Sequence, residues 1–203
     1  NKYAVLLILL FILGIGWIVF SYQTTPKTGF IVIQEVYNGF SMKKQQVFYI
    51  HGGSSYSKYE NFLEHLRTRP LRDLPGEAEP MKKWTKKLRE DLGTDFEVFM
   101  PSMPNSQNAK YQEWKICFER HFEYLHDGLI LLGWSQGGYF LAKYLIENES
   151  PVKIKALLFG AAPFAPDDFG GEDGGDFAFD TSRVHELANK AENIVIMYSK
   201  DDF

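Results

Sequence analysis

The chain has 203 residues, of which 45% are hydrophobic and 24% are charged, and its formal net charge is −4. This composition is ordinary for a globular protein, and the acidic balance excludes the basic surface by which nucleic-acid-binding proteins neutralise phosphates. The lone cysteine, Cys117, permits no internal disulfide, so the fold does not depend on an oxidising compartment. We interpret Cys117 as a small, buried, hydrophobic residue on a helix.

The first 20 residues differ in kind from the rest. Tyr3 to Phe20 contains no charged and no strongly polar side chain, and as a helix it approaches the ~30 Å thickness of a bilayer core. A cleaved signal peptide needs a shorter apolar run and an A-x-A-like site, whereas SYQTTPKTG, which follows, contains no alanine. We therefore expect residues 3–20 to be an uncleaved membrane anchor and residues 21–41 to be a linker, in which residues 30–37 could form an edge strand.

A second start point stays open. Met42, followed by Lys43 and Lys44, directly precedes the first core strand. If the natural protein begins there, residues 1–41 are an upstream translated stretch and the protein is cytoplasmic. Otherwise it is anchored in a membrane, and the sequence does not decide on which side its domain lies.

From residue 42 onward, short apolar runs alternate with amphipathic stretches. Strands are expected at 47–50, 96–100, 129–132, 154–160 and 193–199. Helices are expected at 57–69, 81–92, 109–125, 137–148 and 181–191. This alternation is typical of a parallel sheet with helices on both faces, and its apolar strands are typical of strands buried on both faces. We therefore expect a doubly wound, three-layer α/β domain over residues 42–203.

The hexapeptide GWSQGG, Gly133 to Gly138, lies between the third strand and the helix after it. A G-x-S-x-G sequence in that context is typical of a sharp turn that exposes a nucleophilic serine, here Ser135. The backbone N–H of the next residue, Gln136, is then expected to donate to the oxyanion that forms during acyl transfer.

The second oxyanion donor is expected from the loop after the first strand. That loop reads His51-Gly52-Gly53, and in a doubly wound sheet it would meet the GWSQGG turn beyond the carboxyl ends of the strands. We predict that the N–H of Gly53, or that of its neighbour Ser54, faces the oxyanion. His51 itself is expected to order the loop.

The candidate acid of a catalytic triad lies at the end of the chain. Asp201 and Asp202 follow the fifth strand, where an aspartate can orient an imidazole. In the order Ser, Asp, His the base comes after the acid, and only Phe203 remains. We therefore expect the histidine beyond the end of a C-terminally truncated chain. The alternative is a non-catalytic binding or scaffold protein on the same fold, tethered to a membrane.

The remaining histidines are expected at surface or edge positions on or beside helices: His65, His121, His126 and His185. No pair of them has a metal-ligand spacing with nearby carboxylates, so we expect no metal. No cofactor is expected either.

Several segments together resemble a known family. They are FYIHGG, the loop MPSMPN followed by YQEW, GWSQGGYFLAKYL and the final YSKDDF. In combination they resemble the small serine hydrolases related to retinoblastoma-binding protein nine, within the α/β-hydrolase superfamily. The resemblance covers about residues 42–203, although the family's last helix and histidine are absent from this chain. GWSQGG also resembles the acyl-protein thioesterases and carboxylesterases.

The family resemblance carries functional implications. It implies a compact parallel sheet and a Ser–Asp–His triad, with the serine at Ser135 and the aspartate at Asp202. It also implies hydrolysis of an ester, thioester or amide bond in a small-molecule substrate, without choosing among the three.

A segment rich in glycine and aspartate, residues 163–180, follows the fourth strand. Its phenylalanines could line an apolar acyl pocket at the rim of the site, and these are Phe164, Phe169, Phe177 and Phe179. Its acidic residues, with no lysine or arginine among them, would disfavour anionic substrates. The alternative is a solvated surface loop.

Overall fold

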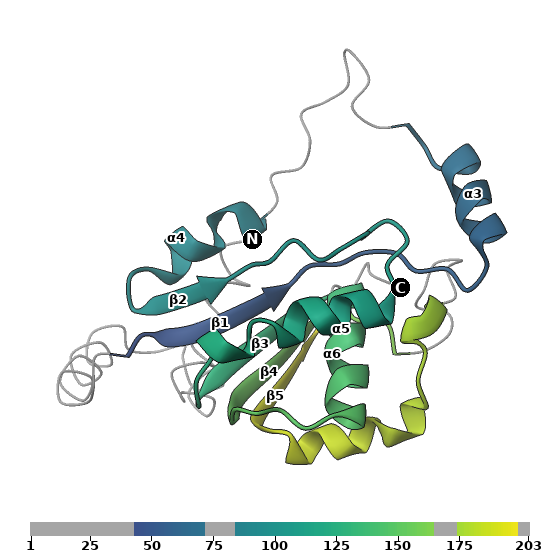
Figure 1. Ribbon diagram of the computed structural model, residues 1–203. Coiled ribbons are helices and arrows are strands. Elements are labelled where there is room, and N and C mark those ends of the chain that lie inside the picture. The colour runs from purple at the N-terminus through teal and green to yellow at the C-terminus, as the bar shows by residue number, and fades with distance from the viewer. Residues whose placement is uncertain (1–42, 72–83, 165–173, 199–203) are drawn as a thin grey trace, which may run out of the picture. The chain divides into compact units, whose positions relative to one another are not determined.

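The computed structural model describes residues 43–71, 84–164 and 174–198 (Figure 1). The expected anchor at 3–20, the linker at 21–41 and the acids Asp201 and Asp202 lie outside these residues. Within the described ranges, no helix combines the length and the hydrophobicity that a bilayer crossing requires.

The described residues fall into two units, one containing residues 84–96 and the other residues 45–71, 97–164 and 174–198. In the first unit, the 3₁₀ helix η1 (Trp84–Lys87) leads into α4 (Leu88–Leu92). Gly93 ends α4 with φ of 78°, and its N–H donates to the carbonyl of Arg89. Glycine adopts such a backbone at little cost, so Gly93 is a suitable residue to end this helix.

The second unit is built on a five-stranded sheet with the order β2-β1-β3-β4-β5. The strands are β1 (Gln45–Ile50), β2 (Phe96–Phe99), β3 (Leu129–Trp134), β4 (Ile154–Gly160) and β5 (Ala191–Met197). The pairs β1–β3, β3–β4 and β4–β5 are all parallel. The predicted α/β class and the position of every predicted core strand are therefore confirmed, although β5 begins and ends earlier than expected.

The helical elements of this unit follow the predicted order. They are α3 (Tyr59–Thr68), α5 (Tyr111–Glu119), η2 (Phe122–Tyr124), α6 (Gln136–Glu147), η4 (Gly175–Phe177) and η5 (Thr181–Asn189). The helix expected at 109–125 is broken after Glu119. His121 explains the break, because its ring Nδ1 contacts the carbonyl oxygen of Cys117 at 2.7 Å while its own N–H donates to Phe118. The ring thus occupies the acceptor that the next α-helical turn would use.

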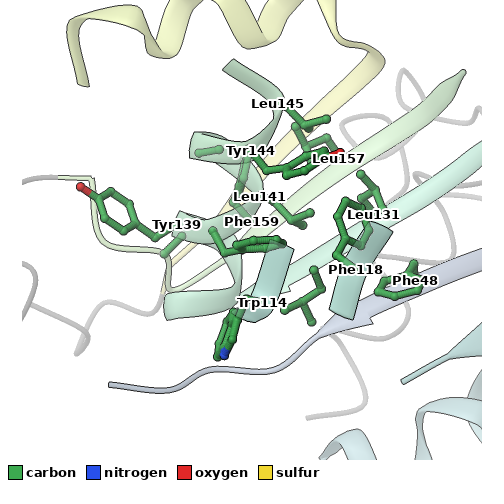
Figure 2. Packing of buried hydrophobic residues seen from close by; sticks show 14 of the residues in the cluster. Phe48, Trp114, Phe118, Leu131, Tyr139, Leu141, Tyr144, Leu145, Leu157 and Phe159 are labelled. Carbon is green, nitrogen blue, oxygen red and sulfur yellow. The ribbon is translucent and has the colours of Figure 1, made fainter. Parts of the chain in front are cut away.

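One face of the sheet carries the main core, to which α5, α6 and η5 contribute (Figure 2). From the strands it includes Phe48, Ile50, Leu129, Leu131, Leu157 and Phe159, and from the helices Trp114, Phe118, Phe140, Leu141, Tyr144 and Leu187. The alternate strand residues, among them Val47, Ile130, Leu132 and Leu158, are buried as well. Strands buried on both faces are what the continuous apolar runs predict for a parallel sheet.

The helix after the predicted nucleophile is the most deeply buried helix of the described chain. All of α6 from Gln136 to Ala142 is buried, as are Tyr144, Leu145 and Ile146. A helix that is apolar nearly all round can only be stable inside a core. Its first residues are therefore held firmly, and with them the turn that contains Ser135.

Candidate active site

Ser135 lies in a strained turn between β3 and α6. Its backbone has φ of 50° and ψ of −123°, which is rare for a residue with a side chain and costs on the order of 1–3 kcal/mol. Three hydrogen bonds hold the turn: the N–H of Ser135 donates to the carbonyl of Gly160 at 2.7 Å, and the carbonyl of Ser135 accepts from the N–H of Gly138 at 2.8 Å and from that of Tyr139 at 3.2 Å. The serine thus sits at the carboxyl end of β3, beside β1, where doubly wound sheets bind ligands.

The glycines of GWSQGG are required by close packing. A methyl group on Gly133 would lie 2.5 Å from the Cα of Gly138, and one on Gly138 would lie 2.6 Å from the Cβ of Ala162. A methyl group on Gly137 would overlap the carbonyl oxygen of Ile50. Backbone atoms, and a Cβ that is attached directly to the backbone, can hardly move aside, so each of these positions excludes a side chain.

The loop after β1 meets this turn, as the sequence predicted. A Cβ atom on Gly52 would lie 3.2 Å from the Cβ and 3.7 Å from the Oγ of Ser135. The N–H of Gly53 and that of Gln136 form no hydrogen bond with another described residue. The structure therefore brings the serine and two unused backbone donors to the same end of β1 and β3.

The backbone N–H of Ser54 is already used in a hydrogen bond and is not free to bind an oxyanion. It donates to the carbonyl of Ser106 at 2.8 Å, and the carbonyl of Ser54 accepts from the N–H of Ala109 at 2.8 Å. The two bonds fasten the loop after β1 to the 103–109 segment. Of the two donors proposed from sequence for this loop, Gly53 is the one whose N–H is available.

Trp114 supports this loop, and the sequence did not identify it as part of the site. It is fully buried, its Nε1–H donates to the carbonyl of Pro104 at 2.7 Å, and a Cβ on Gly53 would lie 3.3 Å from its ring. Trp114 thus packs between the 103–109 segment and the glycine loop. The segment YQEW indicates only a family pattern, because an indole that donates to a backbone carbonyl has no sequence signature.

The hydrogen bonds of the histidine rings in the described ranges are with backbone groups. The N–H of Met103 donates to Nε2 of His51 at 2.8 Å, and Nδ1 of His51 lies 2.6 Å from the carbonyl oxygen of Gly52. Nδ1 atoms of three further histidines contact carbonyl oxygens close in sequence, those of His121, His126 and His185. No histidine in the described ranges is hydrogen-bonded to Ser135.

No metal centre is formed by the part of the chain that the structure describes. It contains no group of three or more histidine, cysteine, aspartate or glutamate residues that could hold an ion. Cys117 is half-buried on α5, and burial raises the pKa of its thiol. A raised pKa keeps the thiol protonated and unreactive at neutral pH.

The three described phenylalanines after β4 pack in three different places. Phe177 is fully buried, with its ring centroid 5.2 Å from that of Trp114, so it belongs to the core. Phe164 packs on Phe159 and Phe179 lies beside Tyr139, and Phe169 lies outside the described residues. Phe177 therefore does not line a pocket at the rim of the site, contrary to the expectation.

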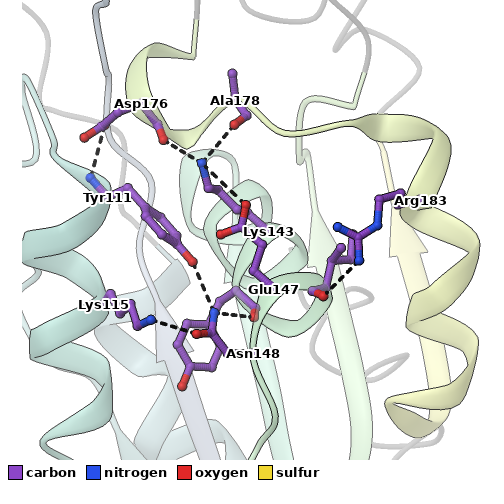
Figure 3. A network of polar contacts seen from close by, with 10 residues as sticks. Tyr111, Lys115, Lys143, Glu147, Asn148, Asp176, Ala178 and Arg183 are labelled. Atoms are coloured by element: carbon purple, nitrogen blue, oxygen red, sulfur yellow. Dashed lines mark hydrogen bonds and ion pairs between the residues drawn. The ribbon is translucent and has the colours of Figure 1, made fainter.

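The end of the same segment is fastened to α5 and α6 (Figure 3). Lys143 donates to the carbonyls of Asp176 and Ala178 at 2.8 and 2.9 Å, and its Nζ lies 4.5 Å from the ring centroid of Tyr111. The carboxylate of Asp176 in turn accepts from the N–H of Tyr111 at 3.1 Å. Residues 174–178 are therefore bound to both helices, although Asp176 and Ala178 are exposed to solvent.

Comparisons with known proteins add little. No family model and no curated protein matches the chain. Among solved structures it resembles the crystal structure of the ydeN gene product from B. subtilis, with a TM-score of 0.47 and 14% sequence identity over 78% of this chain and 73% of that one. This likeness is too distant to carry an argument, so the α/β class of the chain rests on its own parallel sheet.

Proposed function

We propose that this chain carries the nucleophile and the oxyanion hole of a serine hydrolase that acts on an ester, thioester or amide bond of a small substrate. The observation that supports this most is the strained backbone of Ser135, at φ of 50°, packed against the Gly52–Gly53 loop. A serine that served only packing would need neither this strain nor a glycine loop beside its hydroxyl.

The proposed reaction begins with attack of Ser135 Oγ on the carbonyl carbon of the substrate while a base takes the hydroxyl proton. The carbonyl electron pair moves onto oxygen, and this oxyanion accepts hydrogen bonds from the N–H groups of Gly53 and Gln136. The positive end of the α6 dipole adds to this stabilisation. The tetrahedral intermediate then collapses, and the leaving group departs with the proton from the base.

The second half of the reaction restores the enzyme. Water attacks the acyl group on Ser135 and gives one proton to the base, the carboxylic acid is released, and Oγ recovers a proton. We propose Asp202, or its neighbour Asp201, as the acid that orients the base, and a histidine of a longer protein as the base. His51 is not a candidate, because both of its ring nitrogens are engaged.

A fluorophosphonate probe tests the nucleophile in the full-length protein. Ser135→Ala should abolish labelling and leave the circular dichroism spectrum unchanged. Ser150→Ala is the matched control, because Ser150 precedes β4 at the opposite end of the sheet and bonds only to Val152. It should label like the wild type. Equal labelling of Ser135→Ala would disprove the nucleophile, and a folded wild type that never labels would favour the non-catalytic scaffold.

We also propose that residues 3–20 tether this domain to a membrane, since this apolar run is long enough to span the bilayer core. The chain should then remain in the membrane pellet after a carbonate wash at high pH. A version that begins at Met42 should be soluble and folded. Release of the long form by the wash would contradict the anchor and favour the later start.

A further inference from the structure

The two contacts of the His51 ring determine its protonation state. A backbone N–H can only donate, so Nε2, which receives the N–H of Met103, must carry a lone pair. A carbonyl oxygen can only accept, so Nδ1, at 2.6 Å from Gly52 O, must carry the proton. His51 is therefore neutral and protonated on Nδ1. A charged ring would turn a second N–H toward Met103 and lose that bond.

The carbonyl that His51 holds belongs to the peptide unit of the proposed oxyanion donor. Gly52 C=O and Gly53 N–H are the two polar ends of one planar trans peptide, and they point in opposite directions. Fixing the carbonyl on the imidazole therefore fixes the direction of the Gly53 N–H. The bonds from Met103 through the ring to this peptide also form a chain, in which each bond polarises the next.

This peptide needs such a hold because it joins two glycines. Glycine crosses between backbone conformations at little cost, so an unrestrained Gly52–Gly53 peptide could turn over and present its carbonyl to the nucleophile. The residues on either side are already fixed, with Ile50 paired in β1 and Ser54 bonded to Ser106. The ring of His51 is braced by Trp114, with centroids 5.7 Å apart.

We infer that His51 is a positioning residue, which keeps the Gly52–Gly53 peptide in the orientation that offers N–H rather than C=O to the oxyanion. The inference rests on the proposed function for the identity of the oxyanion. It differs from a general role in loop order, because it assigns the effect to one bond, from Nδ1–H to Gly52 O, and not to the bond with Met103.

Two variants of His51 each retain one of its two hydrogen bonds, the one to Gly52 O or the one from Met103 N–H. In His51→Asn the side-chain amide can reach the position of Nδ1 and donate to Gly52 O, but not the position of Nε2. In His51→Gln the amide reaches the position of Nε2 and can accept from the N–H of Met103, but leaves Gly52 O without a donor. We measure the rate constant of fluorophosphonate labelling for the full-length protein and, with a nitrophenyl ester, kcat and KM.

The expected order of rates is wild type, then Asn, then Gln and Ala. His51→Ala should lose about 100-fold in labelling and in kcat, as removal of one oxyanion donor does, with KM within about twofold. His51→Asn should lose less than about 10-fold and His51→Gln about as much as Ala. The melting temperatures should rank Gln above Asn, because the Met103 bond joins segments far apart in sequence. A rate for Gln equal to or above that for Asn would overturn the inference, as would an unchanged Ala variant.

A control and an activity-independent readout complete the test. His121→Ala removes a part-buried ring that also contacts a carbonyl and lies 5.1 Å from the ring of Phe48. It should lower stability but leave labelling unchanged, and a loss like that of His51→Ala would overturn the inference.

The ¹⁵N spectrum of His51 should show the neutral Nδ1–H tautomer. The opposite tautomer would refute the inference whether or not Ser135 reacts, whereas labelling of Ser135→Ala would refute only the proposed function. If His51→Ala does not fold, the Asn and Gln variants decide.

Discussion

The nucleophile turn and the glycine loop beside it are both rich in glycine, but they are held in different ways. The turn from Gly133 to Gly138 has hydrogen bonds of its own, but each of its three glycines is also required by contact, because backbone atoms or the Cβ of Ala162 fill the space where a Cβ would lie. The loop from His51 to Ser55 is held mainly by hydrogen bonds to the 103–109 segment, and contact excludes a side chain there only at Gly53, where a Cβ would lie 2.6 Å from the carbonyl oxygen of Ser106. The first arrangement excludes added atoms, and the second depends on partners that lie far away in the chain.

The difference indicates which changes each region tolerates. Steric closure leaves no room for any side chain, and it is insensitive to changes in the 103–109 segment. A hydrogen-bonded loop accepts a substitution that retains the bond and fails when a distant partner moves. Three substitutions test this contrast, from the largest expected effect to the smallest.

Gly137→Ala should have the largest effect. Its methyl group would overlap the carbonyl oxygen of Ile50 in β1, and overpacking against backbone should cost about 3 kcal/mol or more. Gly128→Ala is the matched control, since Gly128 has φ of 88° but nothing within 4 Å of its Cβ position, and it should cost about 1 kcal/mol. Urea denaturation measures both. Equal losses would show that contact does not close the turn.

Trp114→Phe should have an intermediate effect. It removes the donor to Pro104 O and part of the ring beside Gly53, which should cost about 2 kcal/mol and slow fluorophosphonate labelling. Phe122→Leu is the control, because Phe122 packs on Phe118 and has no ring contact with the glycine loop or Pro104 in the described part of the chain. It should lower the melting temperature without changing the labelling rate. Slower labelling in both variants would show a general loss of packing.

Asn105→Ala should have the smallest effect. Asn105 has φ of 48°, and its amide donates to Glu113 at 2.8 Å on the surface. Alanine in this conformation should cost about 1 kcal/mol, whereas Asn105→Gly should stay within about 0.5 kcal/mol of the wild type. Thermal denaturation of both variants measures the difference. If glycine were as destabilising as alanine, the bond to Glu113 would matter more than the backbone.

The sheet was predictable because its signals are local. Each core strand is a short apolar run, and IKALLFG gives the bounds of β4 without error. The helical elements were less accurate where a side chain competes with the helix. His121 ends α5 by binding a carbonyl. Such competition depends on rotamers that no periodicity records. Residues Thr181–Asn189 form the 3₁₀ helix η5 where an α-helix was expected, and no described contact explains that difference.

In the candidate site, too, the features set by neighbouring residues were predictable and those set by distant residues were not. GWSQGG predicted the turn because its steric demands are contained in six consecutive residues. Neither the exclusion of Ser54 as a donor nor the contact of His51 with Gly52 was predictable. The first depends on the carbonyl of Ser106, and the second on the His51 ring, whose protonated nitrogen is set by the N–H of Met103. Every residue but proline carries the same N–H group, so sequence cannot show that the one of Met103 has a special task.

The burial of Phe177 has a consequence for biosynthesis. Its ring completes the packing around Trp114 and Phe140, residues translated much earlier. A nascent chain that ends before residue 177 therefore leaves this aromatic cluster open, although β1 and β3 are already complete. Closure must wait until that phenylalanine has left the ribosome, and until then the unfinished domain presents indole and phenyl surface to chaperones.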